Sequence, residues 1–291
     1  SRYRSCRVLA WRQGERMMGQ ASFDLIVIGA GQAGPFLAAK LAHAGKKVAL
    51  IEARQLGGTC VNRGCTPTKT LRKSARVAYM ARRAAEFGVD VGPVTVNFGV
   101  AMARMRKRIT DARTGLEGWL GALPGLTIHY AHGQLAGRDG ADFIVQAGEH
   151  TLRAPQVVLN TGTRSFMPPI PGLSTVPALD SEGLLALDEL PKKLVIIGGG
   201  YISLEMAQIF RRLGAEVSVI ENNPRLTSRE DLDVSAAITD LLLSEGIEVI
   251  TGAKVESVQP GDLPGHSRVQ LTDGRLIEGS HLLIATGRTP N

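Results

Sequence analysis

Two cysteines stand five residues apart, at Cys60 and Cys65, in the segment GGTCVNRGCTPTK of residues 57–69. The third cysteine of the chain, Cys6, lies far away in the N-terminal tail. A close pair of thiols in a chain with so few cysteines indicates redox exchange or metal binding before a structural disulfide. No second Cys-x2-Cys and no suitably spaced histidine pair completes a zinc site. Redox chemistry is therefore the first hypothesis, with two inert thiols or half of a zinc site as alternatives.

The spacing of this pair constrains the backbone that carries it. In a regular helix, Cα atoms five residues apart are separated by roughly 8.6 Å, whereas a disulfide needs less than about 7 Å. A bridge between the two cysteines therefore requires an irregular backbone, which Gly64 and Pro67 can supply. A bridge in such a short, distorted ring should be easier to reduce than a relaxed one.

A repeat at an offset of 169 residues indicates how the chain is organised. The segments 23–52 and 193–221 each predict a buried strand, a glycine turn, a helix and a second strand that ends in glutamate. This is the pattern of a βαβ dinucleotide unit. Its first glycine makes the tight turn, the second lets the backbone approach a pyrophosphate, and the third allows the helix to pack closely on the strand. The final carboxylate can accept hydrogen bonds from a ribose diol. The matched positions are Gly29, Gly31, Gly34, Gly45 and Glu52 in the first copy and Gly198, Gly200, Ser203, Gly214 and Glu221 in the second. Two such units indicate electron transfer between two nucleotides.

The segments between the two copies predict a helical pair and a β-rich stretch. The first helix is expected over about 68–87, and the second has an apolar stripe that predicts core packing rather than a cofactor pocket. That stripe consists of Phe98, Met102, Met105, Ile109, Ala112, Leu116 and Trp119. Short strands are expected at 127–130, 143–146 and 157–160, before the sequence PPIPG at 168–172 marks a domain boundary.

The fold class that follows is α/β, with two Rossmann-like nucleotide-binding domains of three-layer ββα type and a helical pair inserted in the first. We expect a non-native or disordered tail at 1–18, a first domain with the cysteine pair at 19–165, and a second domain at 166–286. Residues 287–291 would begin the return to the first domain.

Composition and charge exclude several classes of partner. The chain has 291 residues, a formal net charge of +7 and only 4% aromatic residues. Five arginines and one acid in residues 1–16 supply four of the seven charges. Neither a nucleic-acid nor a membrane partner is expected, because the other charges are dispersed and no apolar run reaches 18 residues. The basic run 104–108 is interpreted as a solvated helix face, and a cytoplasmic location is expected.

Three motifs extend this reading to a family. GGTCVNRGCTPTK, PPIPGL and the closing LLIATGRTPN, together with the two nucleotide units, resemble the flavoprotein pyridine nucleotide-disulfide oxidoreductases. Within that family they most resemble mercuric reductase, with dihydrolipoamide dehydrogenase as a further relative. The resemblance implies that the first unit binds FAD and the second a nicotinamide coenzyme. The cofactor-binding residues it implies are Gly29, Gly31, Gly34, Glu52, Gly57, Gly58, Thr59, Gly133, Thr161, Gly162, Gly198, Gly200, Ser203, Glu221, Gly287 and Arg288.

The resemblance also implies the catalytic groups. Cys65 would be the charge-transfer thiol beside the flavin and Cys60 the interchange thiol that meets the acceptor. Lys69 and Glu205 match the family's ion pair, and Tyr201 matches its aromatic gate. Electrons would pass from the nicotinamide through flavin to the Cys60–Cys65 bridge and on to a disulfide or metal-ion acceptor. A helix N-terminus and nearby cations are expected to lower the thiol pKa, and no resident metal is expected.

The coenzyme is expected to be NADH, because Glu221 would repel the 2′-phosphate of NADPH. Asn222 and Ser228 also favour NADH, because phosphate-binding relatives carry arginines at these positions. Arg225 and Arg229 weaken the argument, because either arginine is near enough to pair with a 2′-phosphate.

In the family that the chain resembles, further segments follow the position of Asn291. The dimerisation domain and its His-Glu pair are absent, so a homodimer is expected of a longer chain and a monomer of this one. No catalytic role is expected for the histidines outside that motif, namely His129, His132, His266 and His281. Two alternatives remain: a nucleotide-binding fragment with little turnover, and a diaphorase or transhydrogenase of the same fold.

Overall fold

The computed structural model describes residues 21–291, so the expected tail at 1–18 lies outside the described residues. The first unit is built on a parallel sheet of order β4-β3-β2-β8. Its strands are β2 (Leu25–Ile28), β3 (Val48–Glu52), β4 (Leu126–Tyr130) and β8 (Val157–Leu159). A second sheet, of order β1-β7-β6-β5, lies beside it. Its strands are β1 (Ala21–Ser22), β5 (Gly133–Asp139), β6 (Asp142–Ala147) and β7 (His150–Ala154).

Alternation along β2 explains the three layers of this unit. Leu25 and Val27 pack with residues of α1 (Ala33–His43), whereas Ile26 and Ile28 pack with residues of β6 and β7. All four side chains are buried, as expected for a central strand covered on both faces.

The helical pair is longer than the sequence pattern predicts. It consists of α2 (Gly58–Arg63), α3 (Cys65–Arg82), the 3-10 turn η1 (Ala84–Phe87) and α4 (Phe98–Gly121), which Asn97 caps by accepting from the N–H of Val100 at 3.0 Å. The predicted stripe is buried at Phe98, Met102 and Met105. Its C-terminal end was wrong, since Ala112 is exposed and Leu120 rather than Trp119 is fully buried. In that half, Leu116 and Leu120 take the positions that face the first sheet.

The second unit repeats the architecture. Its parallel sheet has the order β10-β17-β11-β12-β13. The strands are β10 (Ala178–Leu179), β17 (His281–Ile284), β11 (Lys193–Ile197), β12 (Glu216–Ile220) and β13 (Glu248–Ile250), with helices α5 (Ser181–Leu184), α6 (Tyr201–Leu213) and α7 (Leu232–Ser244). An antiparallel sheet covers the other face, made of β14 (Val255–Pro260), β15 (Ser267–Leu271) and β16 (Leu276–Gly279), and a 3-10 turn, η2 (Leu173–Thr175), precedes them.

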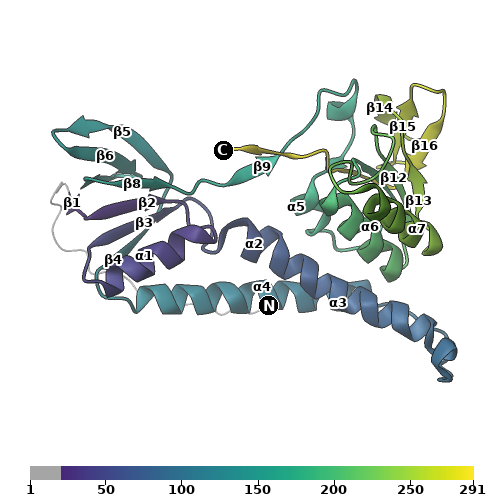
Figure 1. Cartoon of the computed structure of the whole chain (residues 1–291), viewed down its shortest axis with the longest axis horizontal. Helices are drawn as coiled ribbons and strands as arrows, with labels where there is room; N and C mark the ends of the chain where they lie inside the picture. The colour runs from purple at the N-terminus through teal and green to yellow at the C-terminus, as the bar shows by residue number, and fades with distance from the viewer. Residues whose placement is uncertain (1–20) are drawn as a thin grey trace.

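Two kinds of contact join the units. β9 (Thr163–Ser165) pairs antiparallel with β18 (Arg288–Pro290), and Figure 1 shows this ribbon running between the two main sheets. On the other side, α3 and α4 share one hydrophobic core with α6, which includes Leu71, Met102 and Phe210. We propose that the domains divide at residue 165, next to this ribbon. Among residues 21–291, no helix is both long and apolar enough to span a bilayer.

Candidate functional site

The two glycine turns are held by the same hydrogen bonds. The N–H of Gly29 donates to Ile51 O at 2.7 Å, and that of Gly198 donates to Ile220 O at 2.8 Å. Both glycines are left-handed, with φ of 103° and 111°. A Cβ at Gly29 would lie 2.2 Å from Asn160 O, and one at Gly198 would lie 2.5 Å from Ala285 O. Only glycine fits either turn.

The glutamates at the strand ends also match. Glu52 Oε2 accepts from the N–H of Ala30 at 2.8 Å, and Glu221 Oε2 accepts from the N–H of Gly199 at 2.5 Å. The second oxygen of Glu221 accepts from the backbone and side chain of Asn223 at 2.7 and 2.6 Å. Each carboxylate is therefore anchored to its own glycine turn, where a ribose diol would meet it.

The residues whose N–H groups bind the glutamates, Ala30 and Gly199, also accept a hydrogen bond at their carbonyls. The N–H of Gly57 donates to Ala30 O, and the N–H of Thr227 donates to Gly199 O, both at 2.9 Å. The donor is left-handed in both units, with φ of 93° at Gly57 and 45° at Thr227. Thr227 is the one non-glycine residue among 21–291 with a positive φ, and its buried hydroxyl has no partner there. Sequence analysis missed Thr227, because it stands one residue beyond the 169-residue offset from Gly57.

The glycine loop of the first unit has the close backbone packing that a bound flavin nucleotide requires at its pyrophosphate. A Cβ at Gly58 would lie 2.6 Å from the Cα of Gly31, and one at Gly34 would lie 2.3 Å from Gly29 O. Asn160, which the sequence analysis also missed, donates from its amide to Gly29 O at 3.1 Å. The loop is thus a fixed cradle of peptide groups at the start of α1, as a pyrophosphate requires.

The remaining residues assigned to the first nucleotide are spread over neighbouring loops. Gly133 begins β5, where a Cβ would lie 2.9 Å from an Ile28 methyl. Thr161 and Gly162 follow β8, and their carbonyls accept from Asn291 at 2.8 and 3.1 Å. Thr59 lies in α2, directly after Gly58.

The second unit opens into a pocket of about 600 Å³. Its walls include Gly198, Gly200 and Glu221 from the repeat, together with Gly287 and Arg288 from the closing motif. Tyr201 stands at this pocket with 75% of its surface exposed. The wall also contains Thr227, Arg229 and Phe166. Ser203 replaces the third glycine without disrupting the packing, being fully buried in α6 with no partner for its hydroxyl in residues 21–291.

The cysteine pair lies at a break between two helices. Gly64, with φ of −134° and ψ of −107°, ends α2 and precedes α3, so the backbone is irregular where the sequence required it. Thr68 starts α3 by donating its N–H and hydroxyl to Gly64 O, at 3.0 and 2.6 Å. Cys60 is partly buried, whereas Cys65 at the N-terminus of α3 is exposed. The two thiols are free, and Cys65 lies near enough to influence the protonation of Cys60.

The expected lowering of the thiol pKa is wrong for Cys60. Burial, followed by the hydrogen bond to the Cys65 sulfur and its charge, raises the pKa of Cys60 to about 11. The charge of Lys69 opposes this rise and is outweighed. Cys60 therefore retains its proton at neutral pH.

The predicted ion pair forms across the two units. Lys69 Nζ in α3 lies 2.5 Å from Glu205 Oε1 in α6. Glu205 is one helical turn beyond Tyr201, which places the pair and the aromatic ring on the same face of α6. The structure thus brings Lys69, Glu205 and Tyr201 together with the helix that carries Cys65.

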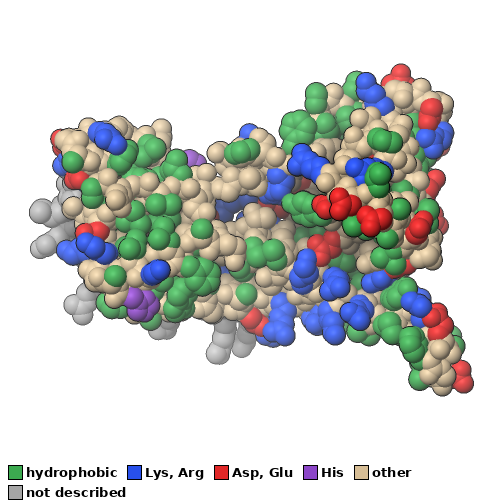
Figure 2. All heavy atoms as spheres, viewed as in Figure 1, with side chains coloured by type: hydrophobic (Ala, Val, Ile, Leu, Met, Phe, Trp, Pro, Cys, Tyr) green, Lys and Arg blue, Asp and Glu red, His purple; other side chains and the backbone are tan. Residues whose placement is uncertain are grey.

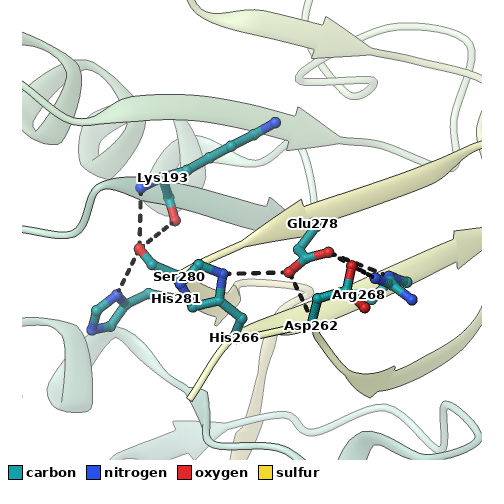
Figure 3. Close-up of polar contacts among 7 residues, drawn as sticks. All are labelled: Lys193, Asp262, His266, Arg268, Glu278, Ser280 and His281. Atoms are coloured by element: carbon teal, nitrogen blue, oxygen red, sulfur yellow. Dashed lines mark hydrogen bonds and ion pairs between the residues drawn. The ribbon is translucent and has the colours of Figure 1, made fainter. Parts of the chain in front are cut away.

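The histidines have structural surroundings. His129 packs against Phe23 and His150, with ring centroids 6.2 and 5.3 Å away. Figure 3 shows a polar cluster in the second unit, where the Ser280 hydroxyl donates to Lys193 O at 3.0 Å. His281 Nδ1 lies 3.1 Å from the same hydroxyl oxygen, which is left to act as the acceptor. Arg268 and His266 both contact Glu278 in that cluster. Within residues 21–291, no group of three or more His, Cys, Asp and Glu could hold a metal ion.

Comparison with known proteins identifies the family of the chain. The family model described as pyridine nucleotide-disulphide oxidoreductase matches residues 23–291. The chain belongs to this family. Family membership and the α/β fold class are confirmed, and FAD is the cofactor that the family implies.

Relatives of this family member include two kinds of enzyme. Dihydrolipoyl dehydrogenase of Chlamydia muridarum is 36% identical over 275 residues, which are 93% of this chain and 57% of that protein. Mercuric reductase of Bacillus cereus is 34% identical over 274 residues, which are 94% of this chain and 43% of that protein. The HOCl-induced flavoprotein disulfide reductase RclA from Escherichia coli has a similar structure, with a TM-score of 0.78, 32% identity, and coverage of 92% of this chain and 57% of that one. The chain spans about half the length of the relatives it matches.

Proposed function

We propose that this chain binds FAD on its first unit and NADH on its second. It would act as part of a flavoprotein disulfide oxidoreductase, which passes electrons from NADH through flavin and the Cys60–Cys65 pair to a disulfide or a metal ion. The observation that supports this most is the placement of the Cys60–Cys65 pair. It sits on helices between two equivalent nucleotide turns, beside the ion pair of Lys69 with Glu205.

The residues of the chain would divide the work as follows. The turns at Gly29 and Gly198 would hold the two pyrophosphates, while Glu52 and Glu221 would accept from the ribose diols. Bound flavin supplies two-electron transfer between a nicotinamide and a sulfur pair. Cys65, which is exposed, would stand beside the flavin, and Cys60 would exchange with the acceptor.

Proton handling follows from the sulfur environment. Since the pKa of Cys60 is raised to about 11, its thiol needs a base before it can attack an acceptor. Two charges among the described residues act on this thiol, that of Cys65, which raises its pKa, and that of Lys69, a cation that lowers it and cannot accept its proton. This observation favours a second candidate, a nucleotide-binding fragment with slow turnover, for the chain taken by itself.

The preference for NADH rests on two features of the second pocket. Glu221 is nearly buried in its wall and would repel a 2′-phosphate. Arg225 donates to the carbonyls of Ser228 and Glu230 at 2.7 Å, so its guanidinium is committed to its own turn. The pocket wall holds two cations, Arg229 and Arg288. Arg288 donates to Thr163 Oγ1 and Thr163 O at 2.7 and 2.8 Å. Replacing Arg229 with alanine should therefore weaken NADPH more than NADH in equilibrium titrations.

The test is an anaerobic reduction of the FAD-loaded chain by NADH, followed by absorption spectroscopy. We expect a long-wavelength sulfur-to-flavin band in the wild type after reduction by one equivalent of NADH, and in Cys60→Ala before NADH is added, because Cys65 then lacks a partner while the flavin is still oxidised. Cys65→Ala should show no such band in either state. Steady-state NADH oxidation with a disulfide acceptor then separates the two candidates, with flavin content measured in each sample. Absence of the band at full flavin occupancy would overturn the proposed role of Cys65.

The acceptor, a homodimeric assembly and a cytoplasmic location belong to the whole protein and stay proposals. A diaphorase or transhydrogenase would show acceptor reduction that Cys60→Ala leaves unchanged.

A further inference from the structure

A groove runs between α3 and α4 and begins one residue after Cys65. It has a volume of about 590 Å³ and is open along its length. Its walls are Thr66, Lys69, Thr70 and Lys73 from α3, and Arg104, Arg108, Asp111 and Ala112 from α4. The side chains are therefore four cations, one acid and three small uncharged groups.

The charge of this groove is only partly neutralised by its surroundings, because Lys69 is paired with Glu205 at 2.5 Å while the other three cations have no acidic partner in residues 21–291. Asp111 accepts from Lys107 with both oxygens, at 2.8 and 2.7 Å, so its charge is already paired. Arg104 donates to Thr70 O at 2.9 Å, which fixes its position but leaves its charge. Lys73 and Arg108 have no hydrogen bond or ion pair within residues 21–291. Figure 2 shows blue side chains gathered over the crossing of α3 and α4.

The interpretation of 104–108 as a merely solvated helix face is therefore incomplete. Arg104 and Arg108 are one helical turn apart, so both reach the groove, whereas Arg106 turns away to Asp188 at 2.6 Å. The basic run places its charges on two separate faces.

The groove is aligned with the sulfur pair. Cys65, Lys69 and Lys73 follow one another at four-residue intervals along one face of α3. The rise from Cys65 to Lys73 is about 12 Å, which is the length of a small organic disulfide. The charge of Lys69, which lines the groove, lowers the pKa of the Cys60 thiol, so the groove and the sulfur pair are close enough to interact electrostatically.

We infer that the groove of Lys73, Arg104 and Arg108 binds the anionic end of the acceptor, so that the sulfur pair prefers small disulfides bearing carboxylates over neutral or cationic ones. This inference rests on the proposed function, since it names the acceptor class of the same sulfur pair. A thiolate of the pair attacks one acceptor sulfur and expels the first thiol. The other cysteine then attacks the mixed disulfide, forming the Cys60–Cys65 bridge and releasing the second thiol.

The test uses the chemically reduced chain, so that neither flavin nor NADH is needed. Cys6→Ser serves as the background, which leaves Cys60 and Cys65 as the two thiols. After reduction with dithiothreitol and desalting, stopped-flow rates are measured with dithiobis(nitrobenzoate), dithiodipyridine and cystamine, which are anionic, neutral and cationic disulfides. The variants are Lys73→Gln, Arg108→Gln and their double mutant, with Arg72→Gln as the control on the same helix outside the groove.

We expect the double mutant to slow the anionic disulfide by about five- to twenty-fold at low salt, to leave the neutral one within about two-fold, and to speed the cationic one. Salt at 0.5 M should remove most of the difference. Arg72→Gln should resemble the background, and circular dichroism should be the same for every variant. Equal effects on the three disulfides, or none, would overturn the inference. A charge preference without NADH turnover would instead leave the groove in place and contradict the proposed function.

Discussion

The two nucleotide units hold their turns in the same way but close around them differently. In both, one turn residue, Ala30 or Gly199, is fixed by two hydrogen bonds. A glutamate accepts from its N–H group, and a residue in the left-handed conformation donates to its carbonyl. In the first unit, bare backbone fills the space, since a Cβ at Gly31, Gly34 or Gly58 would meet other atoms. In the second, a Cβ at Gly200 would meet nothing within 4 Å and a pocket stands open. The tight loop of the first unit suits a permanently bound cofactor such as FAD, and the open pocket of the second suits a coenzyme that binds and dissociates in each turnover, such as NADH.

The largest expected effect comes from adding a methyl group to the first glycine of either turn. Gly29→Ala and Gly198→Ala each combine backbone strain with a clash against a carbonyl, at a cost of about 2–4 kcal/mol. We expect Gly29→Ala to lower flavin content and Gly198→Ala to weaken NADH binding, each by at least about thirty-fold. Flavin absorbance per protein and NADH titration measure the two effects.

Gly45→Ala is the matched control, because Gly45 has a positive φ of 79° but no atom within 4 Å of an added Cβ. It should lower stability modestly and leave both ligands bound. An equal loss of flavin in Gly45→Ala would show that strain, rather than the clash, dominates.

The left-handed clamp residues give the sharpest contrast between the units. Gly57→Ala should lower the free energy of unfolding by about 2–3 kcal/mol, since its Cβ would lie 2.6 Å from that of Val61. Thr227→Gly should change it by less than about 1 kcal/mol, because relief of strain offsets the added freedom of the unfolded chain. Urea unfolding compares them, and a larger loss in Thr227→Gly would contradict the equivalence of the two residues.

Removing the charge of the anchoring carboxylates should have an intermediate effect. Glu52→Gln and Glu221→Gln each weaken charge-assisted bonds to backbone N–H groups, worth about 1–2 kcal/mol. We expect roughly ten-fold weaker flavin binding for Glu52→Gln. For Glu221→Gln, NADH binding should weaken about as much while NADPH binding changes less, so the ratio of the two dissociation constants is the measurement. An unchanged ratio would exclude Glu221 as the discriminating group.

The smallest effect concerns one histidine in each unit. Burial and the charges of His150 and His266 lower the pKa values of His129 and His281 respectively, burial being the larger cause. The unfolded chain therefore binds these protons first, and stability falls as the pH drops from about 7 through the unfolded pKa and levels off below the folded one. Each histidine should contribute only weakly, because both side chains are only partly buried.

Thermal unfolding between pH 7.5 and 5.5 measures this effect. His281→Gln and His129→Gln should each flatten the decline, whereas the exposed His43 offers a control, His43→Gln, that should not. The carboxylates of Asp24, Glu86, Asp273 and Glu278 have lowered pKa values and stay charged in this window. A slope unchanged in both variants would assign it to other groups.

Local pattern predicted much of the fold, and long-range packing decided the rest. β2, β11, their glycine turns and their closing glutamates follow from short-range hydrophobic runs and spacing. Thr227 was unpredictable, because a β-branched residue disfavours the left-handed conformation that its bond to Gly199 imposes. The raised pKa of Cys60 depends mainly on burial, which residue spacing does not reveal. The pairing of Lys69 with Glu205, 136 residues away, could be expected only from the family resemblance.

The shared core of α3 with α6 has a mechanical consequence. The helix that begins at Cys65 buries Leu71 and Ala75 against the same apolar layer as Met206 and Phe210 of the coenzyme unit. A displacement of α6 would therefore be transmitted through this apolar layer to the helix that begins at Cys65. Because α4 also packs on the first sheet through Leu116 and Leu120, the position of the sulfur pair depends on close packing with both units.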